Sequence, residues 1–415
     1  MKVNPGRHRR DCRPPNRSDR PVSHTEDQII ATQQSSTSGA TLQRAAGVVP
    51  ALRALAPRYD TERSFPLESF DALLEAGLLA APLDAALGGD DMDGRPDTRL
   101  AMLRLLKHVG RGDLSVGRLF EGHVNALQLI QIFGTESQIE DWARDVREDG
   151  KRFAVWNTQA GDGVKLVPLE SGRYRMQGSK TFASGACNIE RPIVTGALPD
   201  GGWQMCVVPM DEVATSIDPA WWQPPGMHAS TSFKVDFTGV ELDASALLGQ
   251  PDDYHLQPWF FGGAIRFAAV QLGGAEALLD ETRAFLRGLG RTDDPHQQAR
   301  LGNAAILIEA GNLWIEGAAR AVDISPDRTQ RADQERIINY ANMTRLAIEQ
   351  ICMDVMRLTE RAVGARGLLR PLPNERIIRD LTLYLRQPAP DAAQTSVGRL
   401  ALEREQDAYG LWHDE

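Results

Sequence analysis

The chain has 415 residues, a formal net charge of −10, and 42% hydrophobic and 25% charged residues. This length predicts two or three domains, and the composition predicts that most of the chain folds. The negative charge argues against a nucleic-acid-binding groove and against binding to an anionic membrane surface. No stretch approaches the run of about 20 apolar residues that spans a bilayer, so we expect no membrane insertion.

The cysteines lie far apart and form no C-x-x-C pair: Cys12, Cys187, Cys206 and Cys352. We therefore expect no metal site and no disulfide framework, and we expect a reducing cytoplasm as the location.

Residues 1–45 are rich in Arg, Pro, Ser, Thr and Gln and have hardly any apolar periodicity, which predicts a disordered tail. The tail has no apolar region of the kind found in secretory signals. A transit peptide is a less favoured alternative, because acidic residues interrupt the basic opening. A wrongly assigned start codon is another.

Residues 46–150 show helical periodicity and predict an N-terminal helical domain. Apolar residues spaced three and four apart predict a buried helix face made of Leu67, Phe70, Leu73, Leu74 and Leu78. Near the end of this region, the sequence predicts a helix that starts at Thr135 and stops at Gly150.

Between residues 151 and 250 the apolar period changes to two, with short runs separated by Gly, Pro, Asp and Asn, which predicts a compact β domain. Helical periodicity returns over residues 251–415, with helices long enough for a four-helix bundle. The sequence therefore predicts an α+β fold, mainly α. In that fold an N-terminal helical domain, a central β-barrel domain and a C-terminal four-helix bundle follow one another.

The most specific motif lies in residues 362–391, where a Gly-containing turn and a Pro precede Glu-Arg-Ile-Ile-Arg-Asp at 375–380. Three further segments occur in a matching order: FPLESFDALLEAGLLAAPLDAALGG, QIFGTESQIEDW and GMHASTSFKVDFTGVELDASALLG. Over roughly residues 48–400 the chain resembles the acyl-CoA dehydrogenase superfamily. The resemblance implies that superfamily's fold, with FAD bound between the β domain and the C-terminal bundle.

The resemblance implies three residues beside the flavin ring. Thr158 matches a Thr that hydrogen-bonds the pyrimidine edge, Phe182 matches an aromatic residue packed on the isoalloxazine, and Ser184 matches a hydroxyl residue that contacts N5. These types suit a flavin, which needs a flat apolar wall and donors where charge develops. Without the resemblance, Phe182 is more simply a core aromatic residue and Ser184 a turn residue.

Other matches lie toward the adenine end of FAD. Arg287 falls near a motif whose Arg reaches the FAD pyrophosphate of a neighbouring subunit, although Arg291 is a rival because the run lacks the motif's Phe. Gln297 matches a Gln near the adenine, and Gly364 matches a turn Gly whose amides meet the partner subunit's cofactor. A shared FAD implies a homodimer or homotetramer.

Both positions that hold the catalytic Glu in the superfamily's dehydrogenases are occupied by residues that cannot accept a proton, Pro388 and Ile265. Desaturation of an acyl thioester needs a base for the α-proton, so the catalytic residue is unknown. Arg266 is the polar group that we expect near flavin and substrate. Substitute bases, each weakly favoured, are Asp391, Glu121 and His123.

The flavin monooxygenase branch of the superfamily often carries Leu-His-Asp-Pro at the position where this chain has Leu385-Arg386-Gln387-Pro388. The Pro matches, but the His and the Asp are absent. The chain therefore fits neither branch cleanly.

Three hypotheses follow. We favour an FAD-dependent oxidoreductase that oxidises an acyl thioester, CoA- or carrier-bound, with a non-standard base and an electron-transfer flavoprotein as partner. The first alternative is a two-component monooxygenase that receives reduced flavin from a flavin reductase and acts on a hydrophobic substrate. The second is a catalytically silent scaffold. The sequence leaves the substrate and the electron acceptor open.

Overall fold

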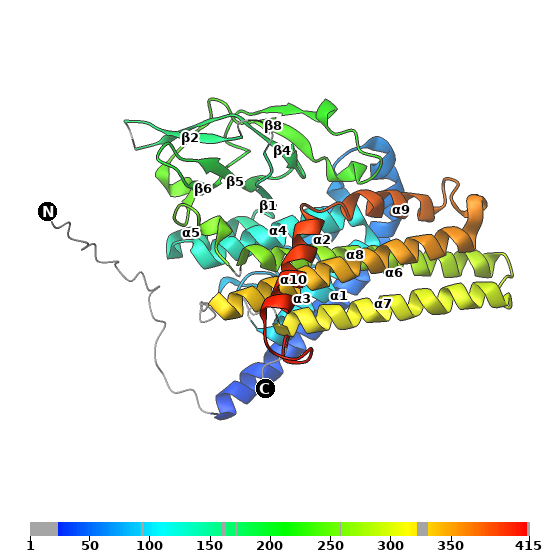
Figure 1. Cartoon of the computed structure of the whole chain (residues 1–415). Coiled ribbons are helices and arrows are strands. Elements are labelled where there is room, and N and C mark those ends of the chain that lie inside the picture. The colour runs from blue at the N-terminus through cyan, green and yellow to red at the C-terminus, as the bar shows by residue number, and fades with distance from the viewer. Residues whose placement is uncertain are drawn as a thin grey trace.

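A computed structural model describes residues 24–92, 95–159, 161, 163–170, 172–257, 259–321 and 331–412. The strands gather on one side of the molecule, and long helices lie beneath them and extend beyond them (Figure 1). Along the chain, helices come first, strands second and helices again last. This confirms the predicted fold class, mainly α with a sheet-containing middle domain.

The helices that precede the strands are α1 (His24–Glu62), α2 (Leu67–Glu75), α3 (Pro96–Gly112), α4 (Leu114–Phe133) and α5 (Glu136–Arg147). Side chains cap the last two. The Asp113 carboxylate accepts a hydrogen bond from the Ser115 amide at 2.6 Å, and the Thr135 hydroxyl accepts one from the Gln138 amide at 3.3 Å. The predicted start at Thr135 is confirmed.

The buried face predicted for α2 is only partly correct. Phe70, Leu73 and Leu78 are buried, but Leu67 and Leu74 are 44% and 41% exposed. The reason is that α2 has 9 residues and packs mainly against α1, so that one narrow side of it meets the core.

The predicted tail, residues 1–45, differs from the structure in its second half, because α1 begins at His24. Residues 1–23 lie outside the described residues. The end of the predicted tail packs onto the loop before α3. Ala45 is fully buried, the Thr41 hydroxyl donates to Asp90 at 2.7 Å, and Arg44 forms an ion pair with Asp90 at 2.6 Å.

The strands are β1 (Phe153–Trp156), β2 (Lys165–Pro168), β3 (Tyr174–Gln177), β4 (Ser179–Ala183), β5 (Arg191–Ala197), β6 (Trp203–Val207), β7 (Ser216–Asp218), β8 (Phe233–Asp236), β9 (Glu241–Leu242) and β10 (Leu247–Leu248). They form two sheets, where a barrel was expected. The larger has the order β10-β6-β5-β2-β3-β9, with β1 parallel to β5, and the smaller has the order β4-β8-β7. A bridge between Gln159 and Lys180 joins the segment after β1 to β4.

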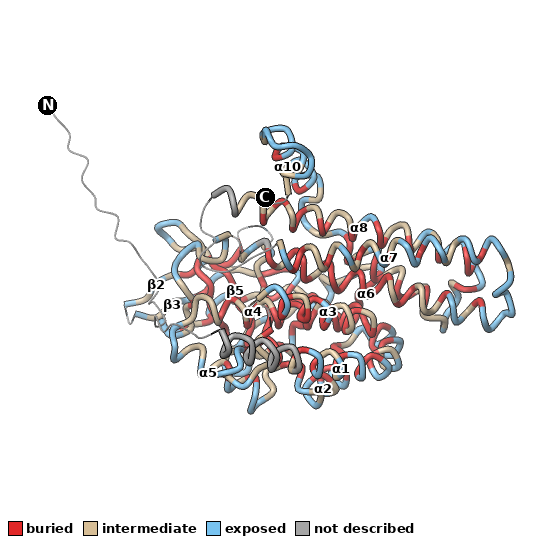
Figure 2. The backbone as a smooth tube through the Cα atoms, turned by 90° about the horizontal axis from the view of Figure 1, so that it is seen from below, coloured by how far each residue is buried: buried red, intermediate tan, exposed pale blue. Residues whose placement is uncertain are grey.

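The helices after the strands are α6 (Trp259–Gly288), α7 (Pro295–Ala321), α8 (Arg331–Gly367), α9 (Pro373–Tyr384) and α10 (Pro390–Glu403). Helix α6 packs against α3, α7, α8 and α9 and is the central element of the bundle. Buried positions concentrate along α3, α4 and α6, while the far ends of α6, α7 and α8 are largely exposed (Figure 2). This arrangement places α4 directly against β1, with α6 packed on α4.

Candidate active site

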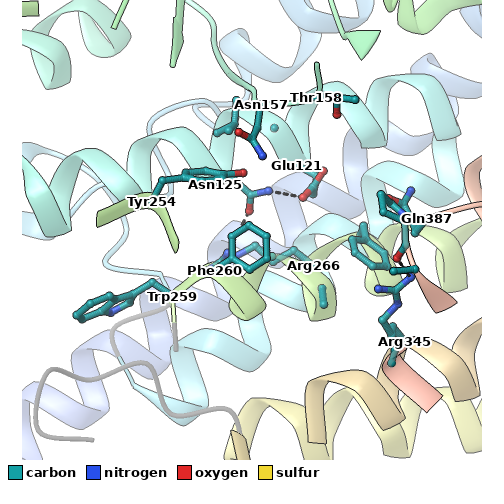
Figure 3. A pocket seen from close by; sticks show the side chains of 18 of the residues that line it. Glu121, Asn125, Asn157, Thr158, Tyr254, Trp259, Phe260, Arg266, Arg345 and Gln387 are labelled. Atoms are coloured by element: carbon teal, nitrogen blue, oxygen red, sulfur yellow. Dashed lines mark hydrogen bonds between the residues drawn. The ribbon is translucent and has the colours of Figure 1, made fainter. Parts of the chain in front are cut away.

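A cavity of about 560 Å³ lies where the strands meet the helices (Figure 3). The strand side contributes Val155, Asn157, Thr158 and Phe182 to its wall. Helices α4, α6, α8 and α10, the segment around Pro388, and Tyr254 contribute the rest. The helix-side wall is largely aromatic and aliphatic: Leu129, Trp259, Phe260, Ala264, Phe267 and Ile338. Residues from all three parts of the chain therefore meet at one site.

Phe182 is the aromatic residue on the strand side of the cavity. It is 48% exposed, and its backbone adopts a φ of 53°. Trp221 and Trp222 hold the ring from one side in edge-on contacts, with centroids at 4.8 and 5.8 Å. A large aromatic ring left exposed at a cavity wall, but fixed by two tryptophans, forms a rigid apolar surface for a ligand.

Thr158 also lies on the cavity wall and is exposed. The segment that carries it is anchored from below, where the buried Lys180 ammonium donates to the Asn157 carbonyl at 3.1 Å and to the Thr195 hydroxyl at 2.9 Å. Burial lowers the pKa of Lys180 to about 7. The position of Thr158 is thus set by the strand beneath it.

Ser184, the third residue expected beside the flavin ring, lies apart from the other two. It is 7% exposed and is not one of the cavity-lining residues. Its hydroxyl is bonded to the Ser232 hydroxyl at 2.9 Å, and its carbonyl accepts from the Trp156 indole at 3.0 Å. In this conformation Ser184 supports the wall.

The strand-side wall fits a flavin ring. Phe182 offers the flat apolar surface and Thr158 offers a hydroxyl on the same cavity. Both were expected near a flavin from the sequence. The sequence did not indicate that Trp221 and Trp222 would hold Phe182, since contacts between separate loops leave no signal in local spacing.

Arg266 lies in the cavity wall, as expected, and belongs to a polar group contributed by α4 and α6. Its guanidinium donates to the Asn125 carbonyl oxygen at 3.0 Å and to Gln128. Asn125 in turn donates to Glu121, which forms an ion pair with Arg118 (Figure 3). Glu121 is only 3% exposed. A linked polar group from α4 and α6 thus lines one part of the cavity.

The two positions at which the superfamily's dehydrogenases hold the catalytic Glu lie in different surroundings. Pro388 lies on the cavity wall, and Ile265 is 2% exposed. Of the substitutes, Glu121 lines the cavity, whereas Asp391 and His123 do not belong to its wall.

His123 has a structural role, because both of its ring nitrogens contact backbone groups. One ring nitrogen contacts the Leu79 carbonyl at 2.9 Å, and the other accepts from the Phe153 amide at 3.1 Å. Burial lowers the pKa of His123 to about 4, so that the ring is neutral. Its role is to join α4 to β1.

The residues expected at the adenine end lie away from this cavity. Arg287 is exposed near the end of α6, while its rival Arg291 pairs with Asp294 at 2.7 Å. Gln297 is 3% exposed and donates to the Ala362 carbonyl at 3.3 Å. Gly364 interrupts α8 with a φ of 59° and a ψ of −173°. Arg287 is therefore the freer of the two arginines, and Gly364 marks a kink between two helical segments.

Two cavity residues of α8, Asn342 and Arg345, were not singled out from the sequence. The available signal was a polar pair three residues apart within an otherwise apolar helix face that includes Ala341 and Ile348.

Within the described ranges, no group of three His, Cys, Asp or Glu side chains could hold a metal ion. None of the described helices is long and apolar enough to cross a membrane.

Known proteins resemble the chain along most of its length. The family model "Acyl-CoA dehydrogenase, N-terminal domain" matches residues 48–148, and "Acyl-CoA dehydrogenase, C-terminal domain" matches residues 265–385. Dibenzothiophene monooxygenase of Mycolicibacterium goodii is 24% identical over 332 residues, which cover 72% of this chain and 78% of that protein. Mitochondrial isobutyryl-CoA dehydrogenase of Dictyostelium discoideum is 23% identical over 370 residues, 85% of each chain.

A solved structure is similar as well. FMN-bound TdsC of Paenibacillus sp. A11-2 superimposes with a TM-score of 0.79 at 19% identity, over 90% of this chain and 100% of that one. TdsC is named a dibenzothiophene monooxygenase. The two family-model matches together cover more than half of the chain, and they lie on the helices on both sides of the strands. The chain belongs to the acyl-CoA dehydrogenase superfamily.

Proposed function

We propose that the chain is the oxygenase of a two-component flavin-dependent monooxygenase, acting on a small, largely apolar substrate. The observation that carries this proposal is the pair Pro388 and Ile265. One lies on the wall of the aromatic cavity and the other in the core, so both positions expected to hold a dehydrogenase base lack a carboxylate. The monooxygenase therefore replaces the acyl-thioester dehydrogenase as the favoured hypothesis, in the reverse of the order drawn from the sequence.

Relatives named dibenzothiophene monooxygenase support the proposal, and so does the similarity of the fold to TdsC. Acyl-CoA dehydrogenases are also among the relatives, so these names favour a class without excluding the other. We propose a flavin as the cofactor. FMN and FAD are both candidates, because the TdsC structure contains FMN and the family resemblance implies FAD.

When bound, a reduced flavin supplies two electrons to O₂, one oxygen atom of which enters the substrate while the other leaves as water. The chain's own residues prepare the site. Phe182 and Thr158 would hold the ring, and the aromatic wall around Trp259 and Phe260 would bind the substrate by apolar contact. A flavin ring and a substrate packed against these walls would displace water from around the reacting atoms.

Glu121 favours the dehydrogenase as a second candidate, because it is the carboxylate found on the cavity wall. Its surroundings argue against this role. An ion pair with Arg118 engages its Oε2 and a hydrogen bond from Asn125 engages its Oε1, so both carboxylate oxygens already have partners within the protein. The same contacts suit a residue that positions Asn125 and, through it, Arg266.

The proposed partners follow from the reaction. A separate flavin reductase would deliver the reduced flavin. We also propose that the chain is a homo-oligomer, because Arg287 and Gly364 lie away from the cavity, where a second subunit could use them. The cytoplasm remains the proposed location.

The test combines the purified chain with an unrelated flavin reductase, NADH, and FMN or FAD, under O₂ labelled with the heavy oxygen isotope. Indole and dibenzothiophene serve as first substrates. Labelled product that requires both proteins supports the proposal. The comparison experiment adds a panel of acyl-CoAs to the flavin-loaded chain without oxygen. Bleaching of the flavin there, without label incorporation in the first experiment, would replace the proposal with the dehydrogenase and make Glu121→Gln the next variant.

A further inference from the structure

Arg345 is a buried cation on the cavity wall without a carboxylate partner. It lies on α8, is 9% exposed, and is a cavity-lining residue. Its guanidinium donates to the Pro388 carbonyl at 3.0 Å and lies 5.4 Å from the centre of the Phe267 ring. Among the described residues, no Asp or Glu forms an ion pair with it. The nearby Glu349 is paired instead with Arg386, at 3.2 Å.

This environment leaves most of the guanidinium's binding capacity unused. An Arg side chain carries five N–H donors, and within the described ranges one acceptor meets them. Burial lowers the pKa of Arg345, whereas Glu349 raises it, and a buried cation without a partner destabilises a fold. A ligand that brings an acceptor with negative charge into the cavity would relieve this cost.

A second unsatisfied group stands beside Arg345. Asn342 lies one turn earlier on α8, lines the same cavity and is 2% exposed. Its Oδ1 has no hydrogen-bond partner among the described residues, so it is an acceptor open to a donor group on the ligand, while Arg345 supplies the donors for an anion. Gln387, another cavity-lining residue, adds a polar side chain beside Arg345 (Figure 3). In the close-up view, Arg345 and Gln387 lie at one end, and Trp259 and Tyr254 at the other (Figure 3).

The cavity is therefore polarised, with an aromatic end and a cationic end. We propose that the substrate is an organic anion, in which a carboxylate, sulfinate or sulfonate binds Arg345 and an apolar or aromatic body fills the opposite end. The pairing uses the planar fork of donors that an arginine presents to an oxyanion. The inference rests on the proposed function for the identity of the site, but the binding step itself needs no turnover.

The flavin phosphate is another anion that could reach an arginine. The strand side of the cavity carries Phe182 and Thr158, whereas Arg345 comes from α8 next to Pro388. Pro388 occupies the position expected for the group that acts on substrate. For this reason we assign Arg345 to the substrate and test the assignment directly.

The experiment measures dissociation constants of the full-length, flavin-loaded chain for two isosteric probes, naphthalene-2-carboxylate and naphthalene-2-carboxamide. We expect the wild type to prefer the acid by about 10- to 100-fold, the range of a charge-assisted pair. Arg345→Met should remove the preference while keeping the affinity for the amide, and Arg345→Lys should keep part of it. Equal affinity of the wild type for both probes, or an unchanged preference in Arg345→Met, overturns the proposal.

A second measurement separates the two anions. The ratio of FMN to riboflavin affinity should be the same in the wild type and in Arg345→Met, and a collapse of that ratio would assign Arg345 to the flavin phosphate and overturn the proposal. Arg345-dependent binding of the acid in a chain that inserts no labelled oxygen would leave this inference standing while the proposed function fails. The two proposals therefore fail separately.

Discussion

Two arginines of the C-terminal region, Arg345 and Arg376, are buried to nearly the same extent, at 9% and 6% exposure, yet their surroundings differ. Arg376, on α9, lies between two buried carboxylates, Asp113 at 3.8 Å and Asp380 at 3.6 Å. Arg345 faces the cavity and has no such partner among the described residues. A buried charge that the fold itself neutralises is structural, whereas one left for the cavity indicates a ligand.

The contacts around Arg376 also show what the Glu-Arg-Ile-Ile-Arg-Asp motif at residues 375–380 does in the fold. Asp380 accepts a hydrogen bond from the Met227 amide at 2.5 Å, and Arg379 forms an ion pair with Asp60 at 2.7 Å. Gly226 approaches the backbone so closely that a Cβ would lie 2.3 Å from the Arg379 carbonyl oxygen. The motif thus joins α9 to α1 and to the loop before β8, and its charged residues hold the domains together.

The largest effect that we predict comes from removing the neutralised arginine. Above pH 7, where Asp380 is ionised, Arg376→Met should destabilise the chain by about 3–5 kcal/mol, because it leaves two buried carboxylates without their cation. Arg345→Met is the matched control and should change the free energy of unfolding by no more than about 1 kcal/mol, since it leaves no carboxylate without its cation and removes only the hydrogen bond to the Pro388 carbonyl. Chemical denaturation of the two variants and the wild type measures both values. Equal losses would contradict the distinction between the two arginines.

The second prediction concerns the pH dependence of the same cluster. Burial, with a contribution from Asp113, raises the pKa of Asp380 from 3.8 to about 7. The folded state then holds a proton that the unfolded state releases, so this group stabilises the fold at low pH and the stabilisation is lost as the pH rises to about 7.

Asn cannot ionise but can still accept the Met227 hydrogen bond. Across that window, the stability of Asp380→Asn relative to wild type should therefore rise by about 1.4 kcal/mol for each pH unit. Urea titrations at several pH values measure this slope. A difference independent of pH would show that Asp380 keeps an ordinary pKa.

The smallest effect falls on the cavity's strand side. Phe182→Ala should weaken flavin binding about tenfold through loss of the aromatic wall, while Phe182→Trp should preserve it. Flavin fluorescence quenching gives both dissociation constants, and thermal unfolding provides the folding control. Unchanged flavin affinity in the Ala variant would indicate that the flavin ring packs against another wall of the cavity.

Local patterns were enough to predict much of the fold. The change of apolar period near residues 151 and 250 matches the observed change from helix to strand and back, because periodicity follows directly from which side of each element is buried. The capping of α5 by Thr135 is likewise a contact within four residues. The residues at Pro388 and Ile265 already excluded the usual base, since no tertiary contact turns either into a proton acceptor.

Only the tertiary structure decided which charged residues neutralise one another and which line the cavity. Arg376 meets Asp113, which lies between α3 and α4 more than 250 positions earlier, and Arg345 meets Pro388 across 43 positions. Glu121 and His123 lie two residues apart on α4, yet one lines the cavity and the other joins α4 to β1. Sequence spacing alone gives no information about such long-range contacts, because they depend on how whole helices pack.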